Sequence, residues 1–298
     1  MSKLRVASVQ FALRKESSLE EFKEHVELWV SKAKNEAAEV VVFPELASTG
    51  LLATITDHEV TGKTVSRDYW DKLSSFAGEI EAFNADLAKR YQLTVLGGSH
   101  NRLADDGTLR NTAFLATADG RSIRQDKIHL TPPEHGMGML GGSELATIEL
   151  GDFTAGILIC ADIQFPELSR ALVARGVDLI LCPSLTWNRR GVHRVRIGCQ
   201  ARAIENQAFV VMSPLIGNSG LPVDAPLYAV GHALVSTPVD KTFGLNDGLL
   251  AYNESTDEGL SLADLDLELL LASREEPEAP GLKLQRPDLY GKLAEHDV

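Results

Sequence analysis

Short apolar runs alternate with amphipathic stretches along most of the chain, and this alternation constrains the fold more than any other sequence feature. Apolar runs of about four to eight residues predict buried strands, whereas apolar residues spaced three and four apart predict helices. The strand-like runs cover residues 5–11, 39–43, 93–98, 111–118, 121–126, 153–159, 177–182, 208–213, 228–236, 249–252 and 260–263. Strands that alternate with helices indicate an α/β protein with mixed sheets.

Amphipathic periodicity predicts helices between these runs. The helices cover approximately residues 17–36, 67–91, 165–175, 192–206 and 265–273. No linker rich in proline, glycine or serine interrupts the pattern, so we expect one domain over residues 1–275. The remaining tail, residues 276–298, is expected to dock on its own chain or to be partly disordered.

The charge and the cysteine content exclude several classes of function. A formal net charge of −13 and a pI near 5.1 argue against binding to nucleic acid or to an anionic membrane surface. Three cysteines, Cys160, Cys182 and Cys199, are too few for a disulfide framework and suit a reducing cytoplasm. No run approaches the roughly 18 apolar residues of a membrane helix, and polar residues interrupt the N-terminal segment. We therefore expect a cytoplasmic protein that acts on small molecules.

Cys160 is the first candidate for chemistry. It closes the apolar run 153–159 and is followed by a helix start that contains Asp162 and Glu167. The thiol is therefore expected at the tip of a buried strand, where a helix N-terminal dipole favours the thiolate. The two acidic residues are expected to complement that dipole. The alternative is a buried structural cysteine, which is the role of most free cysteines.

Two charged residues also stand at the ends of strand-like runs. Glu45 ends the run 40–44, and Lys127 follows the predicted strand 121–126. A carboxylate can accept a thiol proton, and an ammonium can stabilise the charge that develops on an attacked carbonyl. Together with a cysteine they can form a hydrolase site without a catalytic histidine. Taken singly, the two could be an exposed carboxylate and a solvated lysine.

The three segments that contain these residues resemble the nitrilase superfamily of carbon-nitrogen hydrolases, whose motifs carry a Glu, a Lys and a Cys in that order. The matching segments are residues 43–46, 127–130 and 159–168, and the similarity covers about residues 4–275, including 201–207. The resemblance implies a four-layer αββα sandwich, with two mixed sheets packed face to face and helices outside. It also implies that Glu45 is the general base, Lys127 the oxyanion stabiliser and Cys160 the nucleophile.

The same resemblance suggests supporting residues. Glu134 matches a second glutamate of the family, which orients the lysine and helps to place the substrate. The backbone N–H of Ala161, next to the nucleophile, is expected to be a second oxyanion donor. His129 and His135 are expected to be loop-packing residues, because the family uses glutamate as its base. His193, with the other two cysteines, lacks the paired spacing of a zinc site, so we expect no metal and no cofactor.

The residues around the nucleophile bear on the substrate. Family members that hydrolyse nitriles commonly have Trp-Glu after the cysteine, whereas Ala161 and Asp162 stand here, closer to the amidase and carbamoylase branches. The basic segment 187–196 offers Trp187, Arg189 and Arg190 as candidate substrate-binding residues, because a guanidinium can bind a carboxylate bidentately. The alternative for this segment is a solvated helix start or a subunit contact.

Three functions remain open at this point. The first is hydrolysis of a small-molecule amide to a carboxylic acid and ammonia through a cysteine thioester. The second is hydrolysis of an N-carbamoyl amine or acid, or less favourably of a nitrile, by the same fold. A carbamoyl substrate is favoured if an arginine of the basic segment reaches the pocket, the candidates being Arg189, Arg190, Arg194 and Arg196. The third is a catalytically idle binding or assembly protein, which the complete Glu, Lys and Cys set counts against. The resemblance also implies a homodimer or a higher even oligomer. Residues 286–291 resemble C-terminal segments of the family that reach a partner subunit, which implies that the tail, residues 276–298, docks on a partner subunit or on its own.

Overall fold

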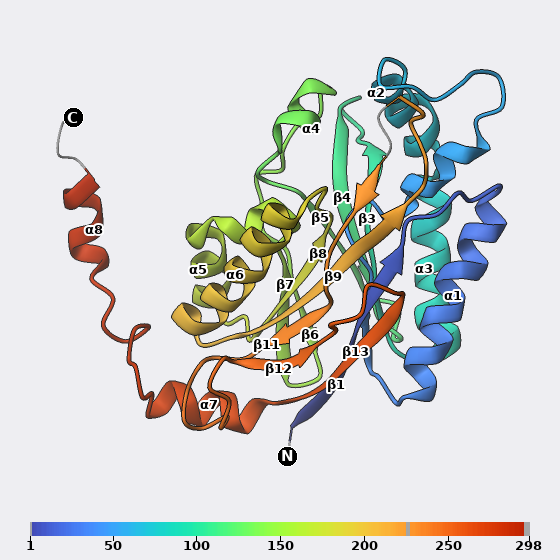
Figure 1. The fold of residues 1–298 in the computed structure, drawn as a ribbon. Coiled ribbons are helices and arrows are strands. Elements are labelled where there is room, and N and C mark those ends of the chain that lie inside the picture. Colours follow the sequence, from blue (N-terminus) through green and yellow to red (C-terminus); the bar gives the residue numbers. More distant parts are fainter. Residues whose placement is uncertain (1, 225–226, 295–298) are drawn as a thin grey trace.

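Two layers of strands lie between two layers of helices (Figure 1). The computed structural model describes residues 2–224 and 227–294. Helices α1 (Leu19–Asn35) and α3 (Ala77–Tyr91) cover one sheet, and α5 (Pro166–Ala174) and α6 (Arg189–Asn206) cover the other. The strands are β1 (Lys3–Ala12), β2 (Val40–Val42), β3 (Thr94–Leu103), β4 (Leu109–Ala116), β5 (Ser122–Asp126), β6 (Thr147–Leu150), β7 (Phe153–Ile157), β8 (Leu179–Ser184), β9 (Phe209–Asn218), β10 (Tyr228–Ala229), β11 (Leu234–Ser236), β12 (Leu249–Tyr252) and β13 (Gly259–Asp266). The predicted α/β sandwich is confirmed.

The two sheets are joined along one edge rather than separate. The strand order is β5-β4-β3-β2-β1-β9-β8-β7-β6, and β13 pairs with β1 while β11 pairs with β9. Strand β1 runs parallel to β9 over only two residue pairs, Phe11 with Leu215 and Ala12 with Ile216. This short contact makes one continuous thirteen-stranded sheet out of the two halves. The sequence pattern did not reveal the junction, because it depends on two residues at the end of one strand.

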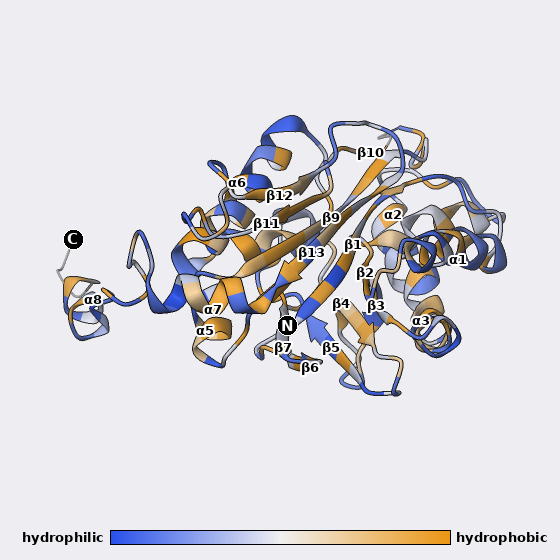
Figure 2. Cartoon of the chain, turned by 90° about the horizontal axis from the view of Figure 1, so that it is seen from below, coloured by the Kyte–Doolittle hydropathy of each residue, from blue (hydrophilic) through white to orange (hydrophobic). Residues whose placement is uncertain are grey.

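Alternate side chains of β2 enter different cores, as the two-residue period of a strand allows. Val40 and Val42 belong to a core that includes Leu181 of the opposite sheet. Val41, between them, belongs to a second core that includes Phe22 of α1. Figure 2 shows the apolar strands at the centre and polar residues on the outer helices. Both faces of β2 are therefore buried, which explains its uniformly apolar sequence.

The predicted helical stretch over residues 67–91 is confirmed, but it is not one regular α-helix. It consists of α2 (Val65–Asp68), a π-helical turn η2 (Tyr69–Leu73), a 3₁₀ turn η3 (Ser74–Phe76) and α3. Trp70 donates its indole N–H to the Met137 carbonyl at 2.7 Å, and the Ser74 hydroxyl donates to the Trp70 carbonyl. A side-chain hydroxyl that binds the backbone competes with regular helix bonds. The irregular turns also bring buried Tyr69 to the candidate site described below.

Several shorter elements also differ from the prediction. Strand β6 was not predicted, and the predicted strand 228–236 is divided into β10 and β11. Between them Gly231 packs so closely on Pro214 that an added Cβ would lie 2.3 Å from the proline ring. Strand β13 leads into helix α7 (Leu267–Glu275), and the predicted tail contains helix α8 (Pro287–Ala294), which lies apart from the sandwich (Figure 1). Docking of this tail on a partner stays a prediction.

Across residues 2–224 and 227–294, no helix combines the length and the apolar composition that crossing a membrane requires.

Candidate active site

Three chemically active side chains follow strands that end at the same edge of the sandwich. Glu45 lies three residues beyond β2, Lys127 directly follows β5, and Cys160 lies three residues beyond β7. Strand β2 is parallel to β3, and β5 points the same way because two antiparallel steps separate it from β3. The carboxyl ends of β2 and β5 therefore meet, and the face-to-face packing brings the end of β7 to them.

The Lys127 ammonium lies between two buried carboxylates. Its Nζ is 2.6 Å from Glu45 Oε1, 3.0 Å from Glu134 Oε1 and 2.8 Å from Glu134 Oε2. The exposed fractions of Lys127, Glu45 and Glu134 are only 2%, 3% and 4%. A buried ammonium persists only with anionic partners. The three groups thus form one electrostatic unit, and loss of Lys127 would leave two buried carboxylates without a cation.

Asn111, the third residue of β4, links the same two carboxylates. Its Nδ2 donates to Glu45 Oε1 at 3.0 Å and to Glu134 Oε1 at 2.8 Å. The N–H and hydroxyl of Thr131 donate to Glu134 Oε2 at 2.8 and 2.7 Å, where Thr131 precedes helix α4 (Pro132–Gly136). Sequence reasoning assigned no role to Asn111. The available signal was a buried amide at the polar end of an otherwise apolar strand.

Cys160 occupies a strained backbone position beside the Glu45 carboxylate. Its φ is +46°, a left-handed conformation that costs about 1–3 kcal/mol for a residue other than glycine. The Sγ atom donates to the Leu185 carbonyl at 3.3 Å and accepts from the Ser184 hydroxyl at 3.5 Å. The Leu185 N–H donates to Glu45 Oε2 at 3.0 Å. Leu185 therefore contacts both the thiol and the carboxylate and fixes one beside the other.

Burial controls the protonation of these groups. Burial and the nearby Glu45 charge raise the pKa of Cys160 well above its usual value, although Lys127 opposes the rise. Burial also raises the pKa of Glu45 despite the Lys127 charge. For Glu134, burial would raise the pKa, but the charge and hydrogen bonds of Lys127 lower it overall. The raised pKa favours the neutral thiol at rest in place of the expected dipole-stabilised thiolate, and Cys160 begins a short 3₁₀ turn, η4 (Cys160–Gln164).

Asp162 connects the loop after Lys127 to the turn at Cys160. Its buried carboxylate accepts from the N–H groups of Ile128 at 3.2 Å, His129 at 2.7 Å and Ile159 at 3.3 Å. The His129 ring stacks on Phe165 with centroids 3.5 Å apart. The predicted dipole partner is thus mainly a clamp between two loops, whereas Glu167 is exposed at the start of α5.

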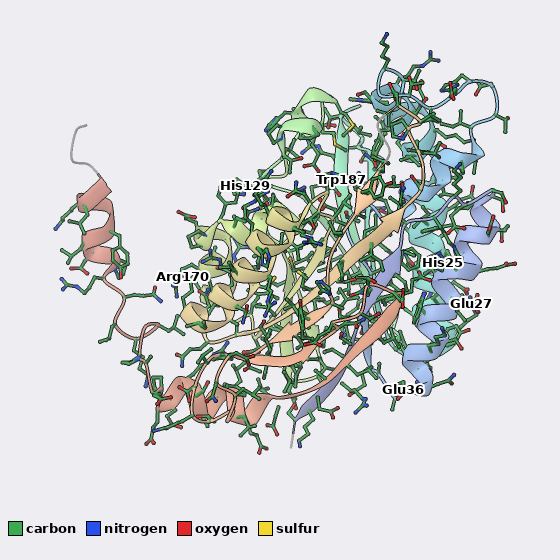
Figure 3. The ribbon with its side chains drawn as sticks, in the orientation of Figure 1. His25, Glu27, Glu36, His129, Arg170 and Trp187 are labelled. Atoms are coloured by element: carbon green, nitrogen blue, oxygen red, sulfur yellow. The ribbon has the colours of Figure 1, made fainter. Side chains whose placement is uncertain are left out.

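A cavity of about 580 Å³ opens over these groups. Glu45, Lys127, Glu134, Cys160 and Ala161 all line it. Trp187 also lines it, with 39% of its surface exposed, and lies at the upper end of the sandwich in Figure 3. The cavity therefore gives a small molecule access to the Cys160 thiol and to the carboxylates around Lys127.

Comparison with known proteins identifies the family. The model of the family described as carbon-nitrogen hydrolase matches residues 5–275. The chain belongs to the carbon-nitrogen hydrolase family. The match covers nearly all of the predicted domain, and it confirms the resemblance inferred from the three motif segments.

Individual relatives of this carbon-nitrogen hydrolase agree in fold and family. A probable hydrolase, YhcX, of Bacillus subtilis is 30% identical over 289 residues, which are 96% of this chain and 54% of the relative. The chain thus spans about half the length of that relative. The omega-amidase NIT2 of Mus musculus is 28% identical over 272 residues, 88% of each chain. The crystal structure of Nit3 of Saccharomyces cerevisiae, a member of branch 10 of the nitrilase superfamily, shares the fold with a TM-score of 0.76, 20% identity and 96% coverage of both chains.

The arginines of α6 in this carbon-nitrogen hydrolase lie on different sides of the helix. Arg189 lines a second cavity of about 560 Å³, together with Arg196, and Arg190 lines neither cavity. Arg194, which was among the arginines considered, lines the cavity that contains Cys160. Helical spacing is the signal that separates them, because Asn188, Gly191, Arg194 and Val195 lie on one face of α6.

The other predicted features of the carbon-nitrogen hydrolase site are located as follows. His135 lies in α4 and is exposed. Cys182 and Cys199 are buried and free. Within residues 2–224 and 227–294, no group of three or more His, Cys, Asp or Glu side chains is arranged to hold a metal ion.

Proposed function

We propose that this carbon-nitrogen hydrolase cleaves the C–N bond of small-molecule amides and releases a carboxylic acid and ammonia through a thioester on Cys160. The observation that carries the proposal is the Lys127 ammonium, which is held between two buried carboxylates and lines the same cavity as the buried Cys160 thiol. A mouse relative named as an omega-amidase supports the choice of an amide. The small-molecule substrate needs no cofactor for this chemistry.

Acylation begins with proton transfer from the thiol. Glu45 accepts the Cys160 proton, and the sulfur forms a bond to the amide carbonyl carbon. The carbonyl oxygen becomes an oxyanion, which the Lys127 ammonium and the Ala161 N–H stabilise. When the oxyanion collapses, the C–N bond breaks and protonated Glu45 gives its proton to the leaving nitrogen. Ammonia departs and the acyl group stays on sulfur as a thioester.

Deacylation reverses the proton movements. Glu45, ionised again, accepts a proton from a water molecule as the water oxygen attacks the thioester carbon. Lys127 and Ala161 hold the second oxyanion. The C–S bond then breaks, the sulfur recovers the proton from Glu45, and the carboxylic acid leaves. Glu134 and Asn111 touch Lys127 or Glu45 throughout, so they act as positioning residues for the two groups that move protons and charge.

A second candidate function is hydrolysis of an N-carbamoyl acid by the same machinery, with release of carbon dioxide and ammonia. The observation that favours it is Arg194 on the cavity wall, because a guanidinium binds carboxylates well. Nitrile hydrolysis and a purely binding role are further outcomes of the experiment below.

Ammonia release tests the proposal directly. Purified wild type, Cys160→Ala and the matched control Cys199→Ala are incubated with amides, N-carbamoyl acids and nitriles. We expect ammonia from amides with wild type and the Cys199 variant only, together with a covalent acyl adduct on Cys160 by mass spectrometry. Release from nitriles alone, or release that survives Cys160→Ala, would overturn it. Folded wild type that releases ammonia from no class would favour the binding role.

Assembly is the second part of the proposal. We propose that the protein acts as a homodimer or higher even oligomer in the cytoplasm, supported by its three free thiols and by exposed Ile197 and Ile204 on α6. Light scattering during gel filtration tests the assembly, and a monomer at micromolar concentration contradicts it.

A further inference from the structure

Arg194 is a cation of the active-site cavity without a partner. Its side chain is exposed and lines the cavity. Within residues 2–224 and 227–294, the structure shows no hydrogen bond, ion pair or ring contact to its guanidinium, whereas Arg196, two residues further along α6, contacts Tyr252. A guanidinium offers five N–H donors in a planar fork. These donors are therefore available to a ligand.

The other cation of the cavity is already neutralised. The three Lys127 hydrogens are directed at Glu45 and Glu134, and those two carboxylates with one ammonium leave a local charge of −1 when all are ionised. The whole chain adds a net charge of −13. An anionic ligand would therefore be repelled from the cavity unless a free cation offset this charge. Arg194 is that cation among the described lining residues.

Helix α6 fixes the position from which Arg194 reaches the cavity. The Asn188 side chain accepts from the Gly191 N–H at 2.9 Å and so caps the helix. Val195, next to Arg194, is 2% exposed and anchors the helix in the core. Because the N-terminal N–H of Gly191 is already bound by Asn188, the anion-attracting group on this wall is the Arg194 side chain rather than the end of the helix.

The wall near Cys160 and Arg194 is mainly apolar. Apart from the charged groups named above, it includes Leu46, Tyr69, Met137, Leu185 and Leu227. Apolar walls favour an apolar segment of ligand and disfavour polar groups that lack partners. A ligand that fills the cavity is therefore expected to carry its reacting group and its charged group at opposite ends of a hydrocarbon linker.

We propose that Arg194 binds a carboxylate on the acyl side of the substrate, so that the natural substrate is an anionic amide with an apolar linker between the two groups. This inference rests on the proposed hydrolysis at Cys160. Arg194 is then a specificity-determining residue that touches the substrate, and the product is a dicarboxylic acid. For an N-carbamoyl acid the same guanidinium binds the same carboxylate, and only the reacting end differs.

The test compares substrates that differ only in charge. For three linker lengths, kcat/KM is measured for the monoamide of a dicarboxylic acid, the neutral amide with a terminal methyl group and the amide with a terminal ammonium, with N-carbamoyl-β-alanine as a further arm. The enzymes are wild type, Arg194→Gln, Arg194→Glu and the matched control Arg190→Gln, whose side chain is equally exposed on the same helix. Wild type should prefer the anionic amide.

The expected pattern is specific to charge recognition. Arg194→Gln should lower kcat/KM for the anionic amide by about tenfold to a hundredfold, which corresponds to the loss of one hydrogen bond to a charged group. The kcat/KM for the neutral amide should stay within about twofold of the wild-type value. Arg194→Glu should shift the preference towards the ammonium-bearing amide. Arg190→Gln should behave as wild type. Equal losses for all three substrates, or the same loss with Arg190→Gln, would overturn the proposal.

A binding measurement separates this inference from the proposed function. Calorimetry with the Cys160→Ala protein and glutarate, a dicarboxylate product analogue, needs no turnover. Glutarate binding that Arg194→Gln weakens by tenfold or more supports the anion site even if no amide is hydrolysed. Turnover of amides without any preference for charge, and glutarate binding unaffected by the substitution, would leave the hydrolase proposal standing and remove Arg194 from it.

Discussion

The reactivity of Cys160 depends on its neighbours rather than on its own acidity. Its thiol is buried and its pKa is raised, so little thiolate is present before substrate binds. Glu45 is held beside it through Leu185. The nucleophilic thiolate is expected to form only when Glu45 accepts the thiol proton. A neutral thiol is also less easily oxidised than a thiolate, so the resting site is protected from oxidation.

Replacement of Glu45 by glutamine should therefore abolish most activity. The variant keeps the size of the side chain but cannot accept the thiol proton, so we expect kcat/KM for an amide to fall by about 10²–10⁴-fold. Iodoacetamide labelling of Cys160 should slow in parallel. The matched control is Glu59→Gln, at an exposed position. A Glu45→Gln protein that is folded by circular dichroism and retains wild-type kcat/KM would contradict the role of Glu45.

The pH profile should report both raised pKa values. The active form needs ionised Glu45 and a neutral thiol, so activity should rise as pH passes the Glu45 pKa, above 4.5, and fall above 9.0. Because the two groups interact, the midpoints belong to the pair. The measurement is kcat/KM against pH with an uncharged amide. An acid midpoint at or below 4.5 would show that burial does not raise the pKa of Glu45.

At the scale of single residues, the sequence predicted positions better than contacts. Cys160 and Glu45 follow apolar runs and Lys127 follows a predicted strand, so their placement at strand ends could be predicted. The contacts of Asn111 could not be predicted, because its two acceptors, Glu45 and Glu134, come from separate parts of the chain. Arg189 and Arg194 carry the same chemistry, and only the face of α6 on which they lie decides which cavity each lines.

At the scale of elements, the site is held together by links between loops. Asp162 joins the segment after Lys127 to the turn at Cys160 through three backbone N–H groups. Such links cannot be predicted from hydrophobic periodicity, because periodicity gives information on one element at a time and none on contacts between elements. The irregular helical turns over residues 65–76 could not be predicted from periodicity either, because Trp70 contacts Met137, which is distant in the sequence.

Asp162→Asn should damage stability and activity together. The asparagine amide has an NH₂ group in place of one carboxylate oxygen, and this group cannot accept a hydrogen bond from a backbone N–H. At least one of the donors is then left unsatisfied, which costs about 1–3 kcal/mol of folding free energy. We expect a lower Tm and a kcat reduced more than KM is raised, because the Lys127 and Cys160 loops lose their common anchor. Glu167→Gln, exposed at the start of α5, is the control. An unchanged Tm and kcat would mean that the loops hold their positions without Asp162.

At the scale of the whole molecule, distant parts of the chain meet at buried His25. Its Nδ1 lies 2.9 Å from Glu16 Oε1 and its Nε2 lies 2.6 Å from Glu258 Oε1, and Figure 3 shows His25 on α1. The cluster joins the segment after β1, helix α1 and the loop before β13. Burial would lower the pKa of His25, but the hydrogen bonds that its ring donates to both glutamates raise it overall.

The contribution of this cluster to stability should depend on pH. A raised His25 pKa stabilises the fold fully below the unfolded value of 6.5 and loses this effect as pH rises through the folded value. The pKa of Glu258 is lowered, although burial opposes this, so its contribution is present above 4.5 and is lost on acidification. The Tm difference between wild type and His25→Gln should therefore be largest between these two values. A difference independent of pH would exclude the ionic contribution, and exposed Glu24→Gln is the control.

The charges buried around Lys127 have a consequence for how salt affects the enzyme. In the proposed acylation the negative charge moves from Glu45 to the substrate oxygen, and Lys127, whose Nζ lies 2.6 Å from Glu45 Oε1, is proposed to stabilise it at both positions. The number of charges inside the protein is thus conserved at every step, and counter-ions in the solvent have no net change to screen. The chemical step should proceed at the same rate in dilute and concentrated salt, whereas capture of an anion by exposed Arg194 should weaken as ionic strength rises.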